Sequence, residues 1–167
     1  IYTGADEENL HLVFPALSQH LDEAMDILAE VAMHPAFNDD ELTKLKRRET
    51  DRLDLMAQRP RWLAGPELNG RLYGEAHPYS RVDTTPEALR RIRRRDLQRW
   101  HRTHFVPSNA FVVAVGDVTK DQVQTAANRA FGSWVNRAVR AAELPPTPER
   151  SAREIVIVDR PGSVQST

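Results

Sequence analysis

Residues 96–118 read DLQRWHRTHFVPSNAFVVAVGDV, and this stretch decides the expected fold. Residues 96–103 are expected to form a helix. Residues 109–116 are a short run rich in Val and Phe, and Gly116-Asp117 ends it, which predicts a buried central strand. Thr119 then stands where the N-cap of a further helix is needed, and Gly132 where its C-cap is needed. A strand enclosed by two helices predicts that helices pack on a sheet.

The region before this stretch predicts one strand followed by several helices. Residues 9–16 read NLHLVFPA, with apolar side chains at alternate positions, as in a strand with one buried face. Ser18 follows as the expected N-cap of a helix that ends near Pro35. The apolar stripe of this helix is expected to consist of Leu21, Ala24, Met25, Leu28, Val31 and Ala32. Three further helices are expected, at residues 38–58, at residues 62–73 and after Thr85.

The character of the chain changes after residue 136. Residues 137–152 are charged and contain three prolines, which is typical of a linker. Residues 154–159 read EIVIVD and predict another buried strand. The sequence therefore predicts an α+β fold with a main unit at residues 1–136, a linker at 137–152 and the opening strand of a second unit at 153–167.

Composition excludes several classes of function. The 167 residues carry a net charge of −1, which argues against nucleic-acid binding through a general positive field. The absence of cysteine excludes disulfides, a cysteine nucleophile and thiolate zinc sites. The longest apolar runs are too short to cross a bilayer, so no membrane span is expected. Because the first residue is Ile1 and not Met, we expect the chain to be part of something longer. Periplasmic and cytoplasmic bacterial locations are both compatible with it.

Histidines and a run of arginines are the first candidates for chemistry. His101 and His104 stand three residues apart, a spacing that places two imidazoles on one helix face and suits zinc. No carboxylate at helical spacing completes a metalloprotease motif, so packing of an aromatic-rich helix end is the simpler interpretation. His77 is interpreted as a residue that fixes a loop. Residues 90–95 read RRIRRR, and because no aromatic residues are interleaved, we interpret them as a solvated face and not as a phosphate site.

Glu49 is a second candidate because it interrupts an apolar stripe. The stripe of the helix predicted at 38–58 consists of Leu42, Leu45, Leu53 and Met56, with Glu49 between them. A carboxylate in such a position must form an ion pair, bind a metal or take up a proton. An ion pair with an arginine on a neighbouring element is the structural interpretation, and a role in a site is the functional one.

The order of several motifs along the chain is more specific than any one of them. The first motif is Tyr2-Thr3 followed by residues 9–14, and the second is residues 37–53 followed by LYGEAHPYSR at 72–81. The third is residues 85–134, which contain TPEAL, the stretch quoted above and AFGSW. The fourth is EIVIVDRPGSVQS at 154–166. In this order they resemble the pitrilysin/insulinase-like zinc peptidases, the group that includes the mitochondrial processing peptidases. The resemblance implies half-domains with a sheet packed on helices, two of which form half of a chamber. Residues 1–136 then correspond to a half-domain without its first strand and its metal-motif helix.

The resemblance also implies where zinc would be bound, and this chain departs from that pattern. Members of the family hold zinc with two histidines of an H-x-x-E-H helix and one distant glutamate. No H-x-x-E-H occurs in this sequence. The distant glutamate is expected eight residues before a proline equivalent to Pro60, a position that Arg52 occupies here. A guanidinium repels a metal ion. Glu49 lies about 4.5 Å earlier along the helix axis, so it would need a shifted helix to replace that ligand.

These departures favour a non-catalytic unit of a zinc-peptidase assembly that contributes to the peptide-holding chamber. The chain is then expected to contain no catalytic residue, no metal ligand and no cofactor, whereas active relatives bind zinc. The resemblance implies that substrate peptide adds as a strand beside Ile1, Tyr2 and Thr3, and that the partner is a homologous catalytic unit or a second copy. Two alternatives stay open. The chain is a fragment of an active zinc metalloendopeptidase whose H-x-x-E-H helix lies upstream, or it is a structural assembly subunit.

Overall fold

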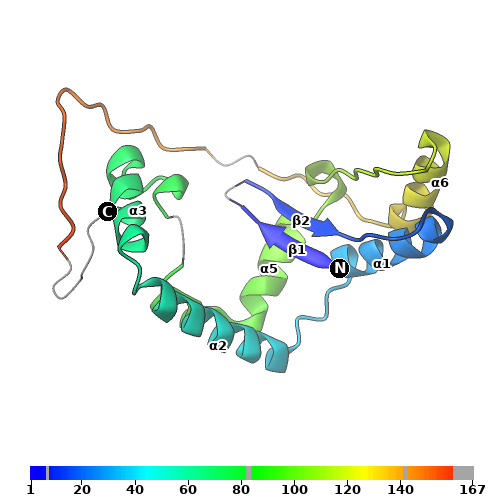
Figure 1. The fold of residues 1–167 in the computed structure, drawn as a ribbon. Coiled ribbons are helices and arrows are strands. Elements are labelled where there is room, and N and C mark those ends of the chain that lie inside the picture. The colour runs from blue at the N-terminus through cyan, green and yellow to red at the C-terminus, as the bar shows by residue number, and fades with distance from the viewer. Residues whose placement is uncertain (7, 82–83, 141–142, 160–167) are drawn as a thin grey trace. The chain divides into compact units, whose positions relative to one another are not determined.

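A computed structural model describes the whole chain except residues 7, 82–83, 141–142 and 160–167 (Figure 1). The chain divides into two compact units, each built from two separate stretches of sequence. Unit 1 combines Ile1–Asn38 with Arg93–Ala141, and unit 2 combines Asp39–Ile92 with the chain from Ala142 onward. Helices together with a small sheet confirm the α+β class that the sequence predicts.

The sheet of unit 1 is an antiparallel hairpin of two strands, β1 (Tyr2–Ala5) and β2 (Leu10–Val13). Its turn is held by Asp6, whose Oδ1 accepts hydrogen bonds from the backbone N–H groups of Glu8 and Asn9 at 2.9 and 2.6 Å. The same two bonds, the one from Glu8 first, hold the pKa of the Asp6 carboxyl below its ordinary value. The strand predicted at residues 9–16 is confirmed in a shorter form.

The helices of unit 1 are α1 (Leu21–Met33), α5 (Arg94–His104) and α6 (Lys120–Phe131), with 3₁₀ turns η1 (Ser18–His20) and η3 (Pro107–Asn109). The core forms where α1 packs against α6 (Figure 1). Met25 and Ala29 of α1 and Ala126 of α6 are buried there. Small side chains at such a contact allow the backbones of two helices to approach closely, and the apolar stripe that the sequence predicts for α1 is therefore confirmed.

Caps fix the start of α6, as the sequence predicts. The Thr119 hydroxyl accepts a hydrogen bond from the Gln122 N–H at 3.3 Å, and the Gln122 side chain accepts one from the Thr119 N–H at 2.7 Å. This reciprocal pair is a capping box. Gly132 is the C-cap of α6. Ser18, in contrast, is not the N-cap of α1: it begins the turn η1, and α1 follows His20 without a side-chain cap.

Unit 2 contains the helices α2 (Asp39–Met56), α3 (Pro60–Tyr73) and α4 (Pro86–Arg91) and the 3₁₀ turn η2 (Pro78–Ser80). Helix α2 packs against α4, and α3 packs against η2. Leu53 of α2 and Leu89 of α4 are buried. The Thr85 hydroxyl accepts a hydrogen bond from the Ala88 N–H at 3.1 Å and so caps α4, as expected.

Two predicted strands are not present in the described residues. Neither residues 109–116 nor residues 154–159 form a strand, so the prediction of two buried strands is wrong for this structure. Phe111 is 83% exposed and Val115 94% exposed. The physical reason is that a strand needs a neighbour for its backbone hydrogen bonds, and β1 and β2 pair only with each other. Local β propensity alone therefore does not fix these segments.

Candidate functional site

The position that the resemblance assigns to a zinc ligand lies on α2 and carries Arg52. The Arg52 Nε donates a hydrogen bond to Glu49 Oε2 at 2.7 Å, and both side chains are partly buried. The Arg48 Nε lies 3.8 Å from the other carboxylate oxygen, Oε1, of Glu49. The Arg52 guanidinium also lies 5.9 Å from the ring centroid of Trp62 on α3, within reach of a cation–π contact. Glu49 is thus part of an ion pair, as its structural interpretation expects, but its partner Arg52 lies on the same helix and not on a neighbouring element.

The residues around Arg52 do not fit a zinc ion. Zinc sites in proteins use three or four ligands about 2.0–2.3 Å from the metal. Within the described part of the chain, no group of three His, Asp or Glu side chains lies close enough together to hold a metal ion. The Glu49 carboxylate is held by a cation of the same helix, and the Arg52 charge would repel a metal brought to that oxygen.

Loss of the Arg52 side chain is expected to cost little stability. Both partners are partly exposed, so the ion pair contributes about 0.3–0.5 kcal/mol, and the contact with Trp62 adds about 0.5–1 kcal/mol. We expect Arg52→Ala to lower the free energy of unfolding by about 1 kcal/mol, as measured by urea denaturation. Arg48→Ala, which removes an exposed and more distant cation, is the control and should change it by less than about 0.5 kcal/mol. A loss of several kcal/mol in Arg52→Ala would contradict this account of the pair.

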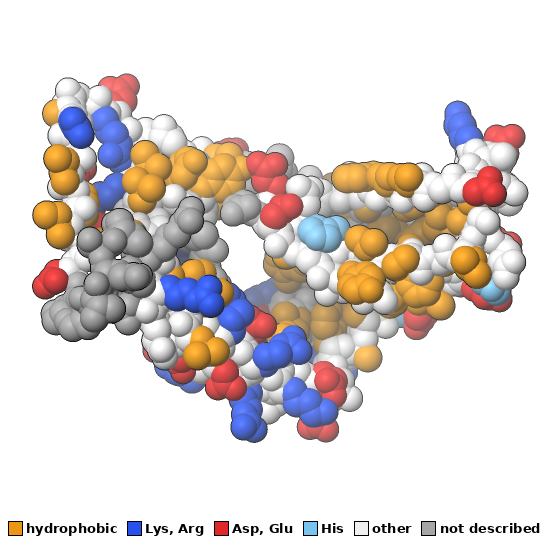
Figure 2. All heavy atoms as spheres, viewed as in Figure 1, with side chains coloured by type: hydrophobic (Ala, Val, Ile, Leu, Met, Phe, Trp, Pro, Cys, Tyr) orange, Lys and Arg blue, Asp and Glu red, His pale blue; other side chains and the backbone are white. Residues whose placement is uncertain are grey.

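The predicted peptide-binding residues lie at the beginning of the hairpin. Tyr2 of β1 faces Val13 of β2, and Thr3 faces Leu12. Ile1, Tyr2 and Thr3 are all exposed, and exposed apolar side chains are visible around the hairpin (Figure 2). In the described residues β1 has one neighbouring strand, so its other edge is open. An open edge can accept an extended peptide through backbone hydrogen bonds.

The structure does not bring His101 and His104 together as a pair of metal ligands. The His101 Nε2 is 2.7 Å from the Ala32 carbonyl oxygen at the end of α1, and the His104 Nδ1 is 2.9 Å from the Trp100 carbonyl oxygen. The His101 ring also stacks on Phe105 with centroids 4.7 Å apart. Both rings therefore pack among aromatic and backbone groups, as the simpler interpretation expects.

His77 and the arginine run also occupy structural positions. The His77 ring is buried and accepts a hydrogen bond from the Tyr79 N–H, so it fixes the loop as expected. Arg90 forms an ion pair with Glu87 at 2.7 Å, whereas Arg94 donates to the Ala36 carbonyl oxygen at 3.1 Å. The run is divided between two helices, and its side chains have different partners.

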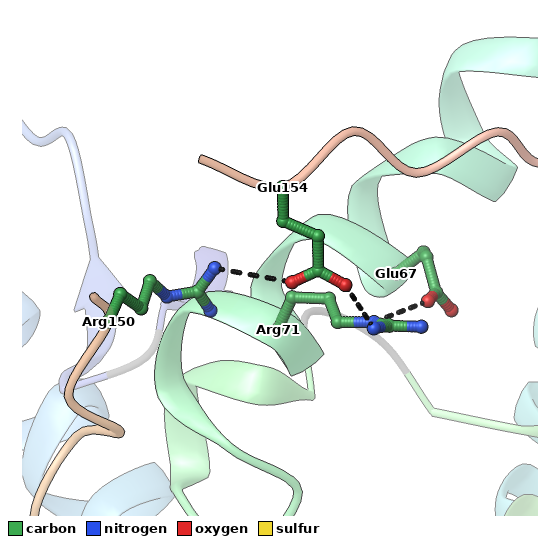
Figure 3. A network of polar contacts seen from close by, with 4 residues as sticks. All are labelled: Glu67, Arg71, Arg150 and Glu154. Atoms are coloured by element: carbon green, nitrogen blue, oxygen red, sulfur yellow. Dashed lines mark hydrogen bonds and ion pairs between the residues drawn. The ribbon is translucent and has the colours of Figure 1, made fainter. Parts of the chain in front are cut away.

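One polar network was not predictable from the sequence. Arg71 on α3 contacts Glu67 at 2.9 Å and Glu154 at 2.5 Å, and Arg150 lies 3.9 Å from Glu154 (Figure 3). A hydrogen bond from Arg71 to Glu67 and the charge of Glu154 hold the pKa of the Arg71 guanidinium above its ordinary value. Arg71 and Glu154 are 83 residues apart in sequence, and no local pattern marks such a pair.

Comparisons with known proteins give two matches in chain order. Residues 3–66 match the family model described as insulinase (peptidase family M16). Residues 91–167 match the model described as peptidase M16 inactive domain. No curated protein matches the chain. Within the described residues, every helix is too short or too polar to span a membrane.

Proposed function

The chain belongs to the insulinase family of peptidases, family M16, and we propose that it is a non-catalytic unit of such a peptidase. The chain is therefore a unit of a peptidase family whose active members generally use zinc. One observation carries the proposal. At the position where the resemblance implies a metal-binding carboxylate, this chain has the cation Arg52, which is paired with Glu49.

In this proposal the positive charge of Arg52 is the reason why the chain does not itself hydrolyse peptides. An active site of this class needs a metal to polarise the peptide carbonyl and to lower the pKa of a bound water. A carboxylate ligand lends negative charge to such a metal, whereas a guanidinium is always positively charged and offers no lone pair. In this proposal the Arg52–Glu49 pair is a structural element of α2, and hydrolysis takes place in another unit.

The proposed contribution of the chain is to hold peptide within a chamber. Support comes from the open edge of β1 beside Ile1, Tyr2 and Thr3, where an extended peptide can add as a further strand. The proposed partner is a homologous catalytic unit or a second copy of this chain, because family units often act in pairs. In this arrangement the partner supplies the metal and this chain supplies part of the surface that holds peptide.

Zinc titration tests the proposal. Calorimetry of the purified chain with zinc chloride at pH 7.5 is expected to detect no stoichiometric site that depends on α2. The matched variant Glu49→Gln removes the nearest carboxylate and is expected to give the same titration as the unchanged chain. A stoichiometric zinc site that Glu49→Gln abolishes would overturn the proposal, because Glu49 would then be a ligand.

A further inference from the structure

The imidazole of His77 is the one histidine ring whose burial is nearly complete among the described residues. It is 5% exposed and lies in the turn between α3 and η2. Its Nδ1 accepts a hydrogen bond from the Tyr79 N–H at 3.2 Å, and the Tyr73 and Tyr79 rings pack against it with centroids 5.2 and 5.1 Å away. Only a neutral imidazole with no proton on Nδ1 can accept this bond.

The backbone of the turn depends on the position of His77. The His77 N–H donates to the Gly74 carbonyl oxygen at 3.0 Å, and the Ser80 hydroxyl donates to the His77 carbonyl oxygen at 2.7 Å. Gly74 has a φ of 82°, a conformation that favours glycine. The backbone of His77 is thus joined to both ends of the turn from Gly74 to Ser80, and its ring is joined to Tyr79.

A segment distant in sequence rests on the same end of α3. We define residues 148–154 as the strap. A Cβ placed on Gly74 would lie 3.3 Å from Pro148 Cγ, so the Pro148 ring covers this glycine. At the other end of the strap, Glu154 binds Arg71, which lies three residues before Gly74 (Figure 3). The strap is thus seated on α3 through one apolar contact with the turn and one ion pair.

We propose that the His77 turn is an acid-sensitive latch that holds the strap against α3. A proton on Nδ1 would direct a ring N–H against the Tyr79 N–H, so the cap of η2 is lost and the turn opens. Movement of Gly74 then removes the surface on which Pro148 lies. The strap is left with the partly exposed Arg71–Glu154 pair, a contact that by itself is weak.

The groups that face the His77 ring differ in chemistry from an imidazole. The groups packed on the ring from α3 and η2 are the phenols of Tyr73 and Tyr79. Glu75 lies in the same turn, and the strap contributes Glu154. Carboxylates ordinarily take up protons near about pH 4, whereas imidazoles do so near about pH 6.5.

A spin label on the strap tests the latch. Because the chain contains no cysteine, Ser151→Cys offers a single attachment point for a nitroxide at an exposed position. The ratio of mobile to immobile label in the electron paramagnetic resonance spectrum is expected to rise about tenfold between pH 7.5 and pH 5.5, because only the opened turn can take up the proton. Arg71→Ala should raise the mobile fraction at both pH values.

Matched histidine variants give the decisive comparison. His77→Asn keeps an N-cap acceptor that cannot be protonated, so the label should stay immobile at both pH values. His34→Asn changes an exposed histidine of unit 1 and should leave the acid response intact. A response that persists in His77→Asn, or no response in the unchanged chain, would overturn the latch. If His77→Asn does not fold, the ¹⁵N chemical shifts of the His77 ring in the unchanged chain provide a second test of the latch. A proton on Nδ1 at pH 7.5 would refute the latch, because Nδ1 could then not accept the bond from Tyr79.

Discussion

Ala126→Glu is expected to unfold unit 1 or to destabilise it severely. Ala126 is 1% exposed and lies at the contact between α6 and α1. A carboxylate there would be taken out of water at a close helix contact, and a buried charge without a full set of partners costs about 3–5 kcal/mol. Domains of this size have a free energy of unfolding of only about 5–15 kcal/mol. Urea denaturation followed by circular dichroism should show a much lower midpoint than that of the unchanged chain.

The neighbouring position supplies the control for this variant. Thr125→Glu introduces the same charge one residue earlier on the exposed face of α6 and should change the free energy of unfolding by less than about 0.5 kcal/mol. Equal effects of the two variants would show that α6 does not pack on α1 through Ala126.

Leu53→Ala is the second variant with a large expected effect, and it concerns unit 2. Leu53 is 5% exposed on α2, the helix that carries Arg52 and Glu49. Removal of a buried leucine side chain costs about 2–5 kcal/mol, because apolar burial is lost and a cavity remains. We expect a loss of that size in urea denaturation.

Leu55→Ala is the matched control on the same helix. Leu55 is 65% exposed, so the same truncation should cost less than about 0.5 kcal/mol. If Leu55→Ala were as destabilising as Leu53→Ala, the result would contradict the assignment of the Leu53 face as the buried face of α2. The position of Arg52 on this helix would then be wrong as well.

The helices were predictable because their signals are local. The apolar stripe of α1, the caps Thr85 and Thr119, and the proline at the start of α4 all lie within the element that they define. The predicted strands at residues 109–116 and 154–159 were not found, since strand formation depends on a partner elsewhere in space. Both segments have strong β propensity, but this local property does not determine which other strand they pair with.

The candidate site shows the same division between local and distant information. The Glu49–Arg52 ion pair joins residues three apart on one helix, and the interruption of an apolar stripe by Glu49 already indicates that it needs a partner. The contacts of His101 with Ala32 and of Arg71 with Glu154 join residues far apart in sequence. Neither leaves a local pattern, so both become visible only in the folded chain.

The central claim is that α2 of this chain supplies no ligand to zinc. Its most direct test is the zinc content of the purified protein and of its Glu49→Gln variant, measured by mass spectrometry of the metal after dialysis. We predict that Glu49→Gln leaves the zinc content unchanged, because Glu49 is bound to Arg52. One tightly held zinc ion per chain that is lost in Glu49→Gln would contradict the account.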